Sequence, residues 1–237
     1  MTERTLEGRL ALVAGASRGI GAATAEALAG AGAHVILIAR TGKELEEVED
    51  RIHDAGGTAT IATMNLTDDG VIAKLSAAVA ERWAKLDILV LNAAMLGTLT
   101  PVPAVDPKEF SKLLTLNLLA PQALIAAFDP LLRKSEAGRV VALTSSVAAT
   151  PRAYWGAYGA SKAALETLVL SYADEVARLT PIRVAIVDPG ATATVMRTRA
   201  FPGEDPATIK QPAVVGEAIT ALLSANFETG HRLRVEG

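Results

Sequence analysis

Tyr158 and Lys162 are the two residues of this sequence whose types and spacing point most directly to chemistry. They lie four positions apart in Tyr158-Gly-Ala-Ser-Lys162, and residues with that spacing share one face of a helix. A phenol with a pKa of about 10 is a poor proton carrier near neutral pH. A neighbouring ammonium group favours the ionised phenol and lowers its pKa. The pair is therefore predicted to exchange a proton with a substrate, although by itself it also fits a surface tyrosine and a solvated lysine.

A glycine-rich turn follows the first apolar segment of the chain. Residues Arg9–Ala14 are typical of a buried strand, and Gly15-Ala-Ser-Arg-Gly-Ile-Gly21 then leads into an alanine-rich helical stretch that ends near Gly30. Glycines allow the backbone to approach a pyrophosphate, and the free amides of a helix start donate hydrogen bonds to anions. The spacing differs from the Gly-x-Gly-x-x-Gly fingerprint, so this segment alone fits either nucleotide binding or a plain strand-to-helix turn.

Further motifs follow the turn in a fixed order. They are Asn92-Ala93-Ala94, Asn117, Ser145-Ser146, Tyr158 to Lys162, and Pro189-Gly190. Together with the glycine-rich turn, they resemble the short-chain dehydrogenase/reductase family over essentially the whole chain, up to a last strand within Thr229–Val235. The resemblance implies a Rossmann-like fold and hydride transfer between a nicotinamide cofactor and a carbonyl or alcohol.

The resemblance also implies a role for each catalytic position. Tyr158 would be the general acid or base, and Lys162 would tune it and hold the nicotinamide ribose. Ser146 would hydrogen-bond the substrate oxygen, with Ser145 as the alternative because the loop before Tyr158 varies in length. Asn117 would hold a water molecule behind Lys162, which would explain a polar residue in an apolar helical stretch.

Charge predicts the cofactor preference. In dinucleotide folds an acid about 20 residues beyond the glycines binds the ribose 2′-hydroxyl, whereas a basic residue accommodates a 2′-phosphate. Here the second strand ends in Ile38-Ala39-Arg40, and Arg18 lies inside the glycine-rich turn. The two guanidinium groups therefore predict a preference for NADP(H), with NAD(H) still possible. The alternative is that both arginines are ordinary surface charges.

The other cofactor contacts follow from the resemblance. Asn65 stands where the family has an acid that accepts a hydrogen bond from the adenine, and its amide oxygen can accept the same bond. Leu91 and Ala94 replace an asparagine and a glycine of the family motif. The predicted cofactor-binding residues are Gly15, Ser17, Arg18, Gly19, Ile20, Gly21, Arg40, Asn65, Leu66, Asn92, Ala93, Ala94, Tyr158, Lys162, Pro189, Gly190, Thr192 and Thr194.

Apolar runs that alternate with helical stretches predict a doubly wound parallel sheet of about seven strands between two helical layers, in one domain spanning 1–237. The strands are expected at Leu10–Ala14, His34–Ala39, Thr58–Met64, Asp87–Leu91, Arg139–Thr144, Ile182–Val187 and Arg232–Val235. Ligands bind beyond the carboxyl ends of such strands, so the motifs are expected to meet there. Residues 191–212 are expected to cover the substrate. The apolar residues near the motifs either line this cleft or pack: Met95, Leu96, Tyr154, Trp155, Met196 and Phe201.

The amino-acid composition excludes several classes of function. A net charge of −3 with interspersed signs offers no basic patch for nucleic acid or membrane, and the absence of cysteine excludes disulfides and thiolate chemistry. The three histidines lack a constellation of metal ligands, so no metal is expected. The apolar runs are predicted to be too short to span a bilayer, which favours a cytoplasmic protein with a small-molecule partner. A homodimer or homotetramer is expected from the family resemblance.

Two function hypotheses remain from the sequence. The first is an NADPH-dependent carbonyl reductase, or equally an alcohol dehydrogenase working in reverse. The second is a regulatory or scaffold protein that retained the nucleotide-binding fold but lost turnover, as the departures at Leu91 and Ala94 would allow. The intact set of Ser146, Tyr158 and Lys162 favours the enzyme.

Overall fold

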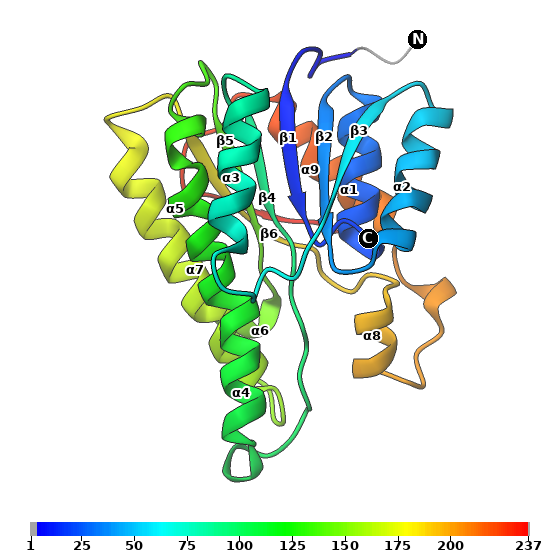
Figure 1. The fold of residues 1–237 in the computed structure, drawn as a ribbon. Helices are drawn as coiled ribbons and strands as arrows, with labels where there is room; N and C mark the ends of the chain where they lie inside the picture. Colours follow the sequence, from blue (N-terminus) through cyan, green and yellow to red (C-terminus); the bar gives the residue numbers. More distant parts are fainter. Residues whose placement is uncertain (1–3, 237) are drawn as a thin grey trace.

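The computed structural model describes residues 4–236, and within them seven parallel strands form one sheet (Figure 1). The strand order is β3-β2-β1-β4-β5-β6-β7. The strands are β1 (Leu10–Ala14), β2 (His34–Ala39), β3 (Thr58–Thr63), β4 (Ile88–Leu91), β5 (Arg139–Leu143), β6 (Arg183–Asp188) and β7 (His231–Arg234). Each lies within one residue, at either end, of the strand expected from the sequence, and the predicted fold class is confirmed.

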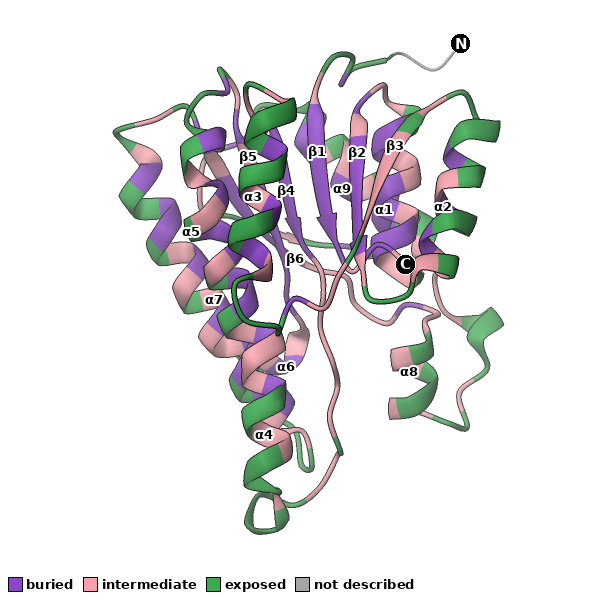
Figure 2. Ribbon diagram, in the orientation of Figure 1, coloured by how far each residue is buried: buried purple, intermediate pink, exposed green. Residues whose placement is uncertain are grey.

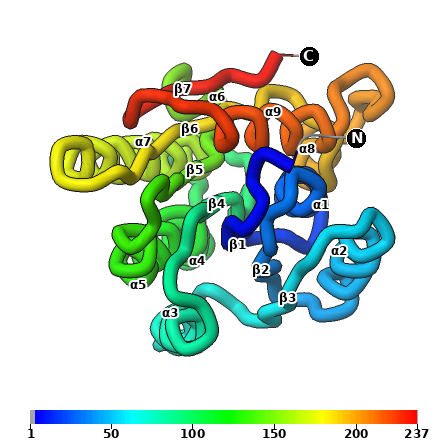
Figure 3. Tube along the Cα trace, turned by 90° about the horizontal axis from the view of Figure 1, so that it is seen from above, coloured from blue at the N-terminus to red at the C-terminus, as the bar shows by residue number. Residues whose placement is uncertain are grey.

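Helices cover both faces of the sheet (Figures 1 and 3). One face carries α1 (Gly19–Gly30), α2 (Gly42–Asp54) and α9 (Pro212–Ser224), and the other carries α3 (Val71–Arg82), α4 (Pro107–Leu114), α5 (Ala120–Leu132) and α7 (Gly156–Ala177). Short helices occur at α6 (Ser146–Ala149), α8 (Val195–Ala200), Val102–Ala104 and Pro206–Thr208. The central strands are buried on both faces, which explains their continuous apolar sequences (Figure 2).

Alternate side chains of the strands enter two separate cores. In β1, Leu10 and Leu12 pack with the α3, α5 and α7 side of the sheet, whereas Ala11 and Val13 pack with the α1, α2 and α9 side. Because the strands from β1 to β6 contribute to both cores, their carboxyl ends are held firmly. The loops that follow the strands therefore start from fixed positions.

The sheet has a switch point between β1 and β4. From β1 the chain proceeds outward to β2 and β3, whereas from β4 it proceeds the other way to β5, β6 and β7. The connections leaving β1 and β4 therefore diverge and leave a crevice at their carboxyl ends. Gly15 follows β1 and Asn92 follows β4, so two of the sequence motifs flank this crevice.

The helical stretch Pro107–Leu132 is divided in the middle. Asp106 caps its start by accepting a hydrogen bond from the backbone amide of Lys108, and α4 then passes through the π-helical segment Thr115–Leu119 into α5. The stretch has 26 residues, and an 18-residue window within it has a mean hydropathy of 1.3, so it is long and apolar enough to cross a membrane by those two criteria. This corrects the expectation that no apolar stretch is long enough. Phe128 and neighbouring side chains pack in the core against the sheet, and core helices pass the same two criteria.

Candidate active site

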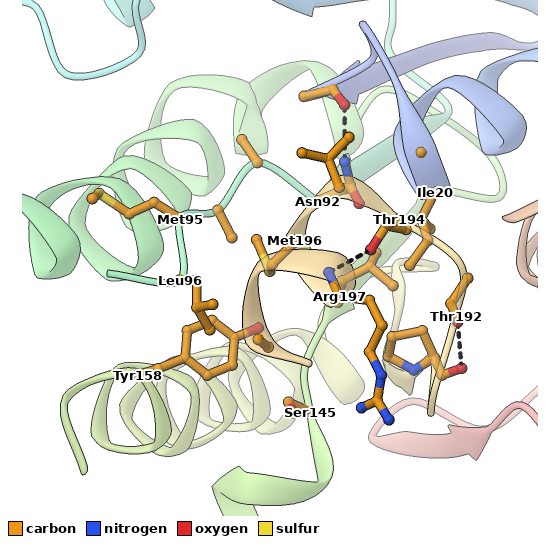
Figure 4. Close-up of a pocket in the computed structure, with 18 of the residues that line it drawn as sticks. Ile20, Asn92, Met95, Leu96, Ser145, Tyr158, Thr192, Thr194, Met196 and Arg197 are labelled. Carbon is orange, nitrogen blue, oxygen red and sulfur yellow. Dashed lines mark hydrogen bonds between the residues drawn. The ribbon is translucent and has the colours of Figure 1, made fainter. Parts of the chain in front are cut away.

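A cleft of about 1210 Å³ lies at the carboxyl ends of the strands (Figure 4). It is lined by the glycine-rich turn, by the loops after β2, β3, β4, β5 and β6, and by the start of α7. The sequence-predicted site residues line this cleft with two exceptions, Gly21 and Asn117, which lie behind its wall. The expected convergence of the motifs on one edge of the sheet is therefore present.

The glycine-rich turn is shaped by close backbone contacts. Gly15 and Gly19 have φ angles of +77° and +58°, a region that favours glycine. A Cβ atom on Gly21 would overlap the carbonyl oxygen of Gly15, so α1 can pack this closely on the turn only without a side chain there. The amino end of α1 has no side-chain cap, which leaves its amides for a ligand. This cradle fits the pyrophosphate of a dinucleotide.

Asn92 stabilises the turn from the neighbouring strand. Its Nδ2 donates to the carbonyl oxygens of Ala14 at 3.2 Å and Gly15 at 3.0 Å. A Cβ atom on Gly15 would lie 2.9 Å from the Cα of Ala93. The Asn92-Ala93-Ala94 motif therefore supports the turn in addition to lining the cleft.

Two exposed arginines lie at the end of the cleft formed by the turn and β2. Arg40 directly follows β2, and Arg18 is the residue before α1; both line the cleft. The Nη1 of Arg18 lies 3.9 Å from the Oε1 of Glu44 in α2. Sequence reasoning missed this carboxylate, although it lies only four residues after Arg40 at the start of a helix. The pair is exposed and long, so it leaves Arg18 available to a phosphate.

Asn65 follows β3 and lines the cleft, but its side chain already has local partners. Its Oδ1 accepts from the hydroxyl of Thr67 at 3.0 Å and from the Thr67 amide at 3.4 Å, while its Nδ2 donates to Asp68 at 2.7 Å. A hydrogen bond from an adenine amino group to this oxygen would compete with Thr67. The predicted adenine contact of Asn65 thus requires the local turn to change.

Tyr158 and Lys162 lie on the first turns of α7 and are almost fully buried, with exposed fractions of 7% and 2%. The Nζ of Lys162 donates a 2.8 Å hydrogen bond to the carbonyl oxygen of Leu143, the last residue of β5. The same Nζ lies 5.9 Å from the centre of the Tyr158 ring. The helix therefore places both side chains on one face, as their spacing predicted.

The pKa values of this pair reflect burial. Burial raises the pKa of Tyr158 above its usual value, and the carboxylate of Asp188 at the end of β6 adds to the rise. Burial also lowers the pKa of Lys162 from 10.5 to about 8. The expectation that the ammonium lowers the tyrosine pKa is therefore wrong for the protein alone. The reason is that loss of solvation disfavours both charged forms, and Tyr158 is strongly desolvated.

The lysine shift predicts a pH dependence of stability. Below pH 8 Lys162 is protonated in both the folded and unfolded states, and burying its charge costs about 3 kcal/mol. Between pH 8 and 10.5 the folded state loses this proton first, so the cost disappears as the pH rises. We expect the wild type to gain stability relative to Lys162→Met across that window, as measured by urea unfolding of both proteins. A difference that stays constant from pH 7 to 10.5 would refute the burial argument.

Asn117 lies in the π-helical segment and is fully buried. Its amide oxygen accepts from the Met95 amide at 2.8 Å, and its Nδ2 donates to the Met95 carbonyl at 2.9 Å and to the Ser161 hydroxyl at 3.1 Å. These partners explain a polar residue among leucines, because they satisfy its amide group. Asn117 ties the loop after β4 to α7, and its predicted contact with a water molecule stays a prediction.

The loop after β5 carries both candidate serines. Ser145 is the residue before α6, Ser146 is the first residue of that helix, and both are half-buried in the wall of the cleft. Figure 4 shows Ser145 on the same side of the cleft as Tyr158. A Cβ atom on Gly159 would lie 3.0 Å from the Val147 carbonyl oxygen, so the glycine after Tyr158 lets α6 approach α7 closely.

A partly buried carboxylate fixes the start of this loop. Glu166, one helical turn after Lys162, accepts a 2.5 Å hydrogen bond from the Thr144 hydroxyl and a 2.6 Å bond from Arg232 of β7. It thereby joins the residue after β5 and the first half of β7 to α7. Sequence reasoning missed Glu166, although its spacing from Lys162 was the same four residues that singled out Tyr158.

The part of the cleft next to Tyr158 is largely apolar. Five of the six apolar residues proposed from the sequence line it: Met95, Leu96, Trp155, Met196 and Phe201. Tyr154 does not line it; this residue is 59% exposed and has a φ of +72°. Residues of the 191–212 segment form one wall, with Thr194 capping α8 by accepting from the Arg197 amide (Figure 4).

Comparison with known proteins agrees with this geometry. Residues 9–205 match the family model for short chain dehydrogenase. The chain belongs to the short-chain dehydrogenase/reductase family. It is 37% identical to the uncharacterized oxidoreductase YciK of Escherichia coli K12 over 88% of this chain and 83% of that protein.

Solved structures of this family share the fold closely. A short chain dehydrogenase from Salmonella enterica serovar Typhi superposes with a TM-score of 0.95 at 34% identity, covering 100% of this chain and 99% of that one. A metagenomic short-chain oxidoreductase, solved in complex with NADP, has a TM-score of 0.84 at 32% identity and covers 98% of this chain and 99% of that one. The short-chain dehydrogenase/reductase described here is accordingly an oxidoreductase.

Proposed function

We propose that this enzyme interconverts a carbonyl compound and a secondary alcohol with NADP(H) as the hydride carrier. The observation that carries the proposal is the convergence of Tyr158, Lys162 and the Ser145-Ser146 loop in the same cleft as the glycine cradle and the two arginines. When bound, the nicotinamide would donate or accept the hydride. The residues of the chain would position it and move the proton.

Each residue would contribute at a stated atom. The hydroxyl of Tyr158 would donate its proton to the carbonyl oxygen during reduction, and the raised pKa keeps that proton in place until it is needed. The Nζ of Lys162, held by Leu143, would orient the nicotinamide ribose. The hydroxyl of Ser146 would donate a second hydrogen bond to the substrate oxygen, and both donors would stabilise its developing charge.

The serine assignment predicts unequal effects of two neighbouring substitutions. Ser146→Ala is expected to lower kcat by about a hundredfold, because it removes a hydrogen-bond donor to the developing charge. Ser145→Ala is expected to change kcat much less. Steady-state kinetics of both variants checks this, and each serves as the control for the other. If Ser145→Ala were the damaging change, the donor would be Ser145.

The preference for NADP rests on Arg18 and Arg40, and a metagenomic relative that is 32% identical was solved with NADP. A guanidinium group binds a 2′-phosphate through charge-assisted hydrogen bonds that NADH cannot form. We expect Arg40→Ala to weaken NADPH binding by about tenfold and to leave NADH binding unchanged. Calorimetric titration with each cofactor measures this. Equal weakening of both cofactors would contradict a phosphate-specific role.

The test of the proposed reaction is NADPH oxidation, followed by absorbance, across a panel of ketones. Turnover of at least one compound that is strongly reduced in Tyr158→Phe is expected. Tight NADPH binding with no turnover of any compound would instead favour a regulatory protein that has kept the cofactor site. In that case, the loss of turnover would be attributed to the Asn92-Ala93-Ala94 motif and to Leu91 before it, where the sequence departs from the family pattern.

A further inference from the structure

The cleft is basic in a protein that is acidic overall. Three carboxylates and seven cationic side chains line it, although the whole chain has a net charge of −3. The carboxylates belong to Glu44, Glu109 and Asp188, and the cations to Arg18, Arg40, Arg152, Lys162, Arg197, Arg199 and Arg234. Such an arrangement attracts anions into the cleft.

Most of these cations already have a partner or a proposed one. Arg197 forms two hydrogen bonds to Glu204, at 2.5 and 2.6 Å, and Arg234 lies 3.3 Å from Glu236. Lys162 donates a hydrogen bond to a backbone carbonyl oxygen. Arg18 and Arg40, on the other side of the cleft, are proposed to bind the cofactor.

Arg152 and Arg199 are left over. Neither forms an ion pair within 4.0 Å in the part of the chain from residue 4 to residue 236. Both are exposed and both line the cleft, so their guanidinium groups can reach a ligand from solvent.

Aromatic contacts bring the segments that carry these two arginines together. Arg152 lies three residues before Trp155, and Arg199 lies two residues before Phe201. The rings of Trp155 and Phe201 have centroids 5.7 Å apart and are tilted by 31°. Trp155 also contacts the ring of Tyr158 edge to face, with centroids 5.9 Å apart. The loop before α7 and the helix α8 therefore meet beside the catalytic tyrosine.

From this arrangement we propose that the substrate is an anionic carbonyl compound, whose oxyanion is bound by Arg152 and Arg199. The inference rests on the proposed function and specifies its substrate class. The apolar wall formed by Met95, Leu96 and Met196, together with the two aromatic rings, accommodates an apolar or aromatic body. The planar guanidinium fork suits either a carboxylate or a phosphate.

Matched ligand pairs test the proposal by binding and by turnover. The first pair is 4-acetylbenzoic acid and its methyl ester, and the second is 4-acetylphenyl phosphate and 4-methoxyacetophenone. Dissociation constants are measured by calorimetry with NADP⁺ present, and kcat/KM is measured with NADPH. We expect at least one anion to bind about tenfold or more tightly than its neutral counterpart, with a preference that weakens as salt is added.

Variants of the protein identify the side chains that cause the preference for anions. The double variant Arg152→Ala/Arg199→Ala is expected to lose it while keeping the turnover of the neutral ketones. Arg178→Ala, at the far end of α7 from Tyr158, removes an exposed arginine outside the cleft and is expected to keep the preference. Equal binding of both members of each pair, or a preference that survives in the double variant, overturns the proposal. Anion-selective binding without turnover would support the anion site and count against the redox function, so the two failures are distinguishable.

Discussion

Replacing Tyr158 by phenylalanine is expected to lower kcat by about a hundredfold to ten-thousandfold, the range typical of losing a general acid. Only 7% of Tyr158 is exposed, because the wall of the cleft and the packing of the helix bury the rest. The substitution removes one hydroxyl group from this side chain. Phenylalanine fills the same volume and keeps the edge-to-face contact with Trp155. Folding and NADPH binding should therefore remain, and the loss should appear in kcat measured by NADPH oxidation.

Tyr172 provides the matched control. It lies on the same helix, it is 8% exposed, and its hydroxyl donates a 2.8 Å hydrogen bond to Asp129. It does not line the cleft. Tyr172→Phe should change stability by about 1 kcal/mol without changing kcat. If the two substitutions reduced kcat equally, the effect would come from packing of α7 and not from proton transfer.

Substituting alanine for Gly21 is expected to abolish measurable NADPH binding. The new methyl group would overlap the carbonyl oxygen of Gly15 and press against the Nδ2 of Asn92, which itself holds that turn. Because these obstacles are backbone and a fixed amide, α1 must move away from the turn. The amides at its amino end would then no longer point into the cradle. Calorimetric titration with NADPH measures the loss.

Gly30 at the end of the same helix is the control for this change. A Cβ atom there would meet nothing within 4 Å, so Gly30→Ala should keep NADPH affinity and slightly stabilise the helix. Thermal unfolding of both variants separates loss of the cradle from loss of the fold. Unchanged NADPH affinity in Gly21→Ala would show that the cofactor does not bind at this turn.

Much of this fold could be predicted, because the residue pattern of each segment agrees with the place that the segment takes in the folded sheet. Central strands buried on both faces must be apolar throughout, so segments such as Leu10–Ala14 stand out from the helical stretches between them. The site could be located without knowing the order of the strands, because in a parallel sheet the loops that follow the strands all lie at the same edge. The helix around Asn117 was predicted as one element, but it contains a π-helical segment in which Asn117 forms hydrogen bonds with Met95 and Ser161, both distant in sequence.

The parts of the site that escaped prediction depend on partners distant in sequence. The pKa of Tyr158 follows from its burial and from Asp188 on another strand, neither of which the Tyr158–Lys162 spacing contains. Glu44 and Glu166 acquire their roles from Arg18 and Thr144, which are brought to them by folding. Asn65 was expected to accept a hydrogen bond from the adenine, but Thr67 and Asp68 already bind its side chain.

The most direct test of the account follows the transferred atom. The enzyme would be incubated with NADPH carrying deuterium at C4 of the nicotinamide, on one face and then on the other, and with the ketone panel that includes 4-acetylbenzoic acid. Mass spectrometry of the alcohols should find deuterium on the carbinol carbon with one labelled face only, and the initial rate of labelling should be at least about a hundredfold lower with Tyr158→Phe. Saturating NADPH binding with no labelled alcohol from any carbonyl compound would contradict the central claim that this cleft performs hydride transfer.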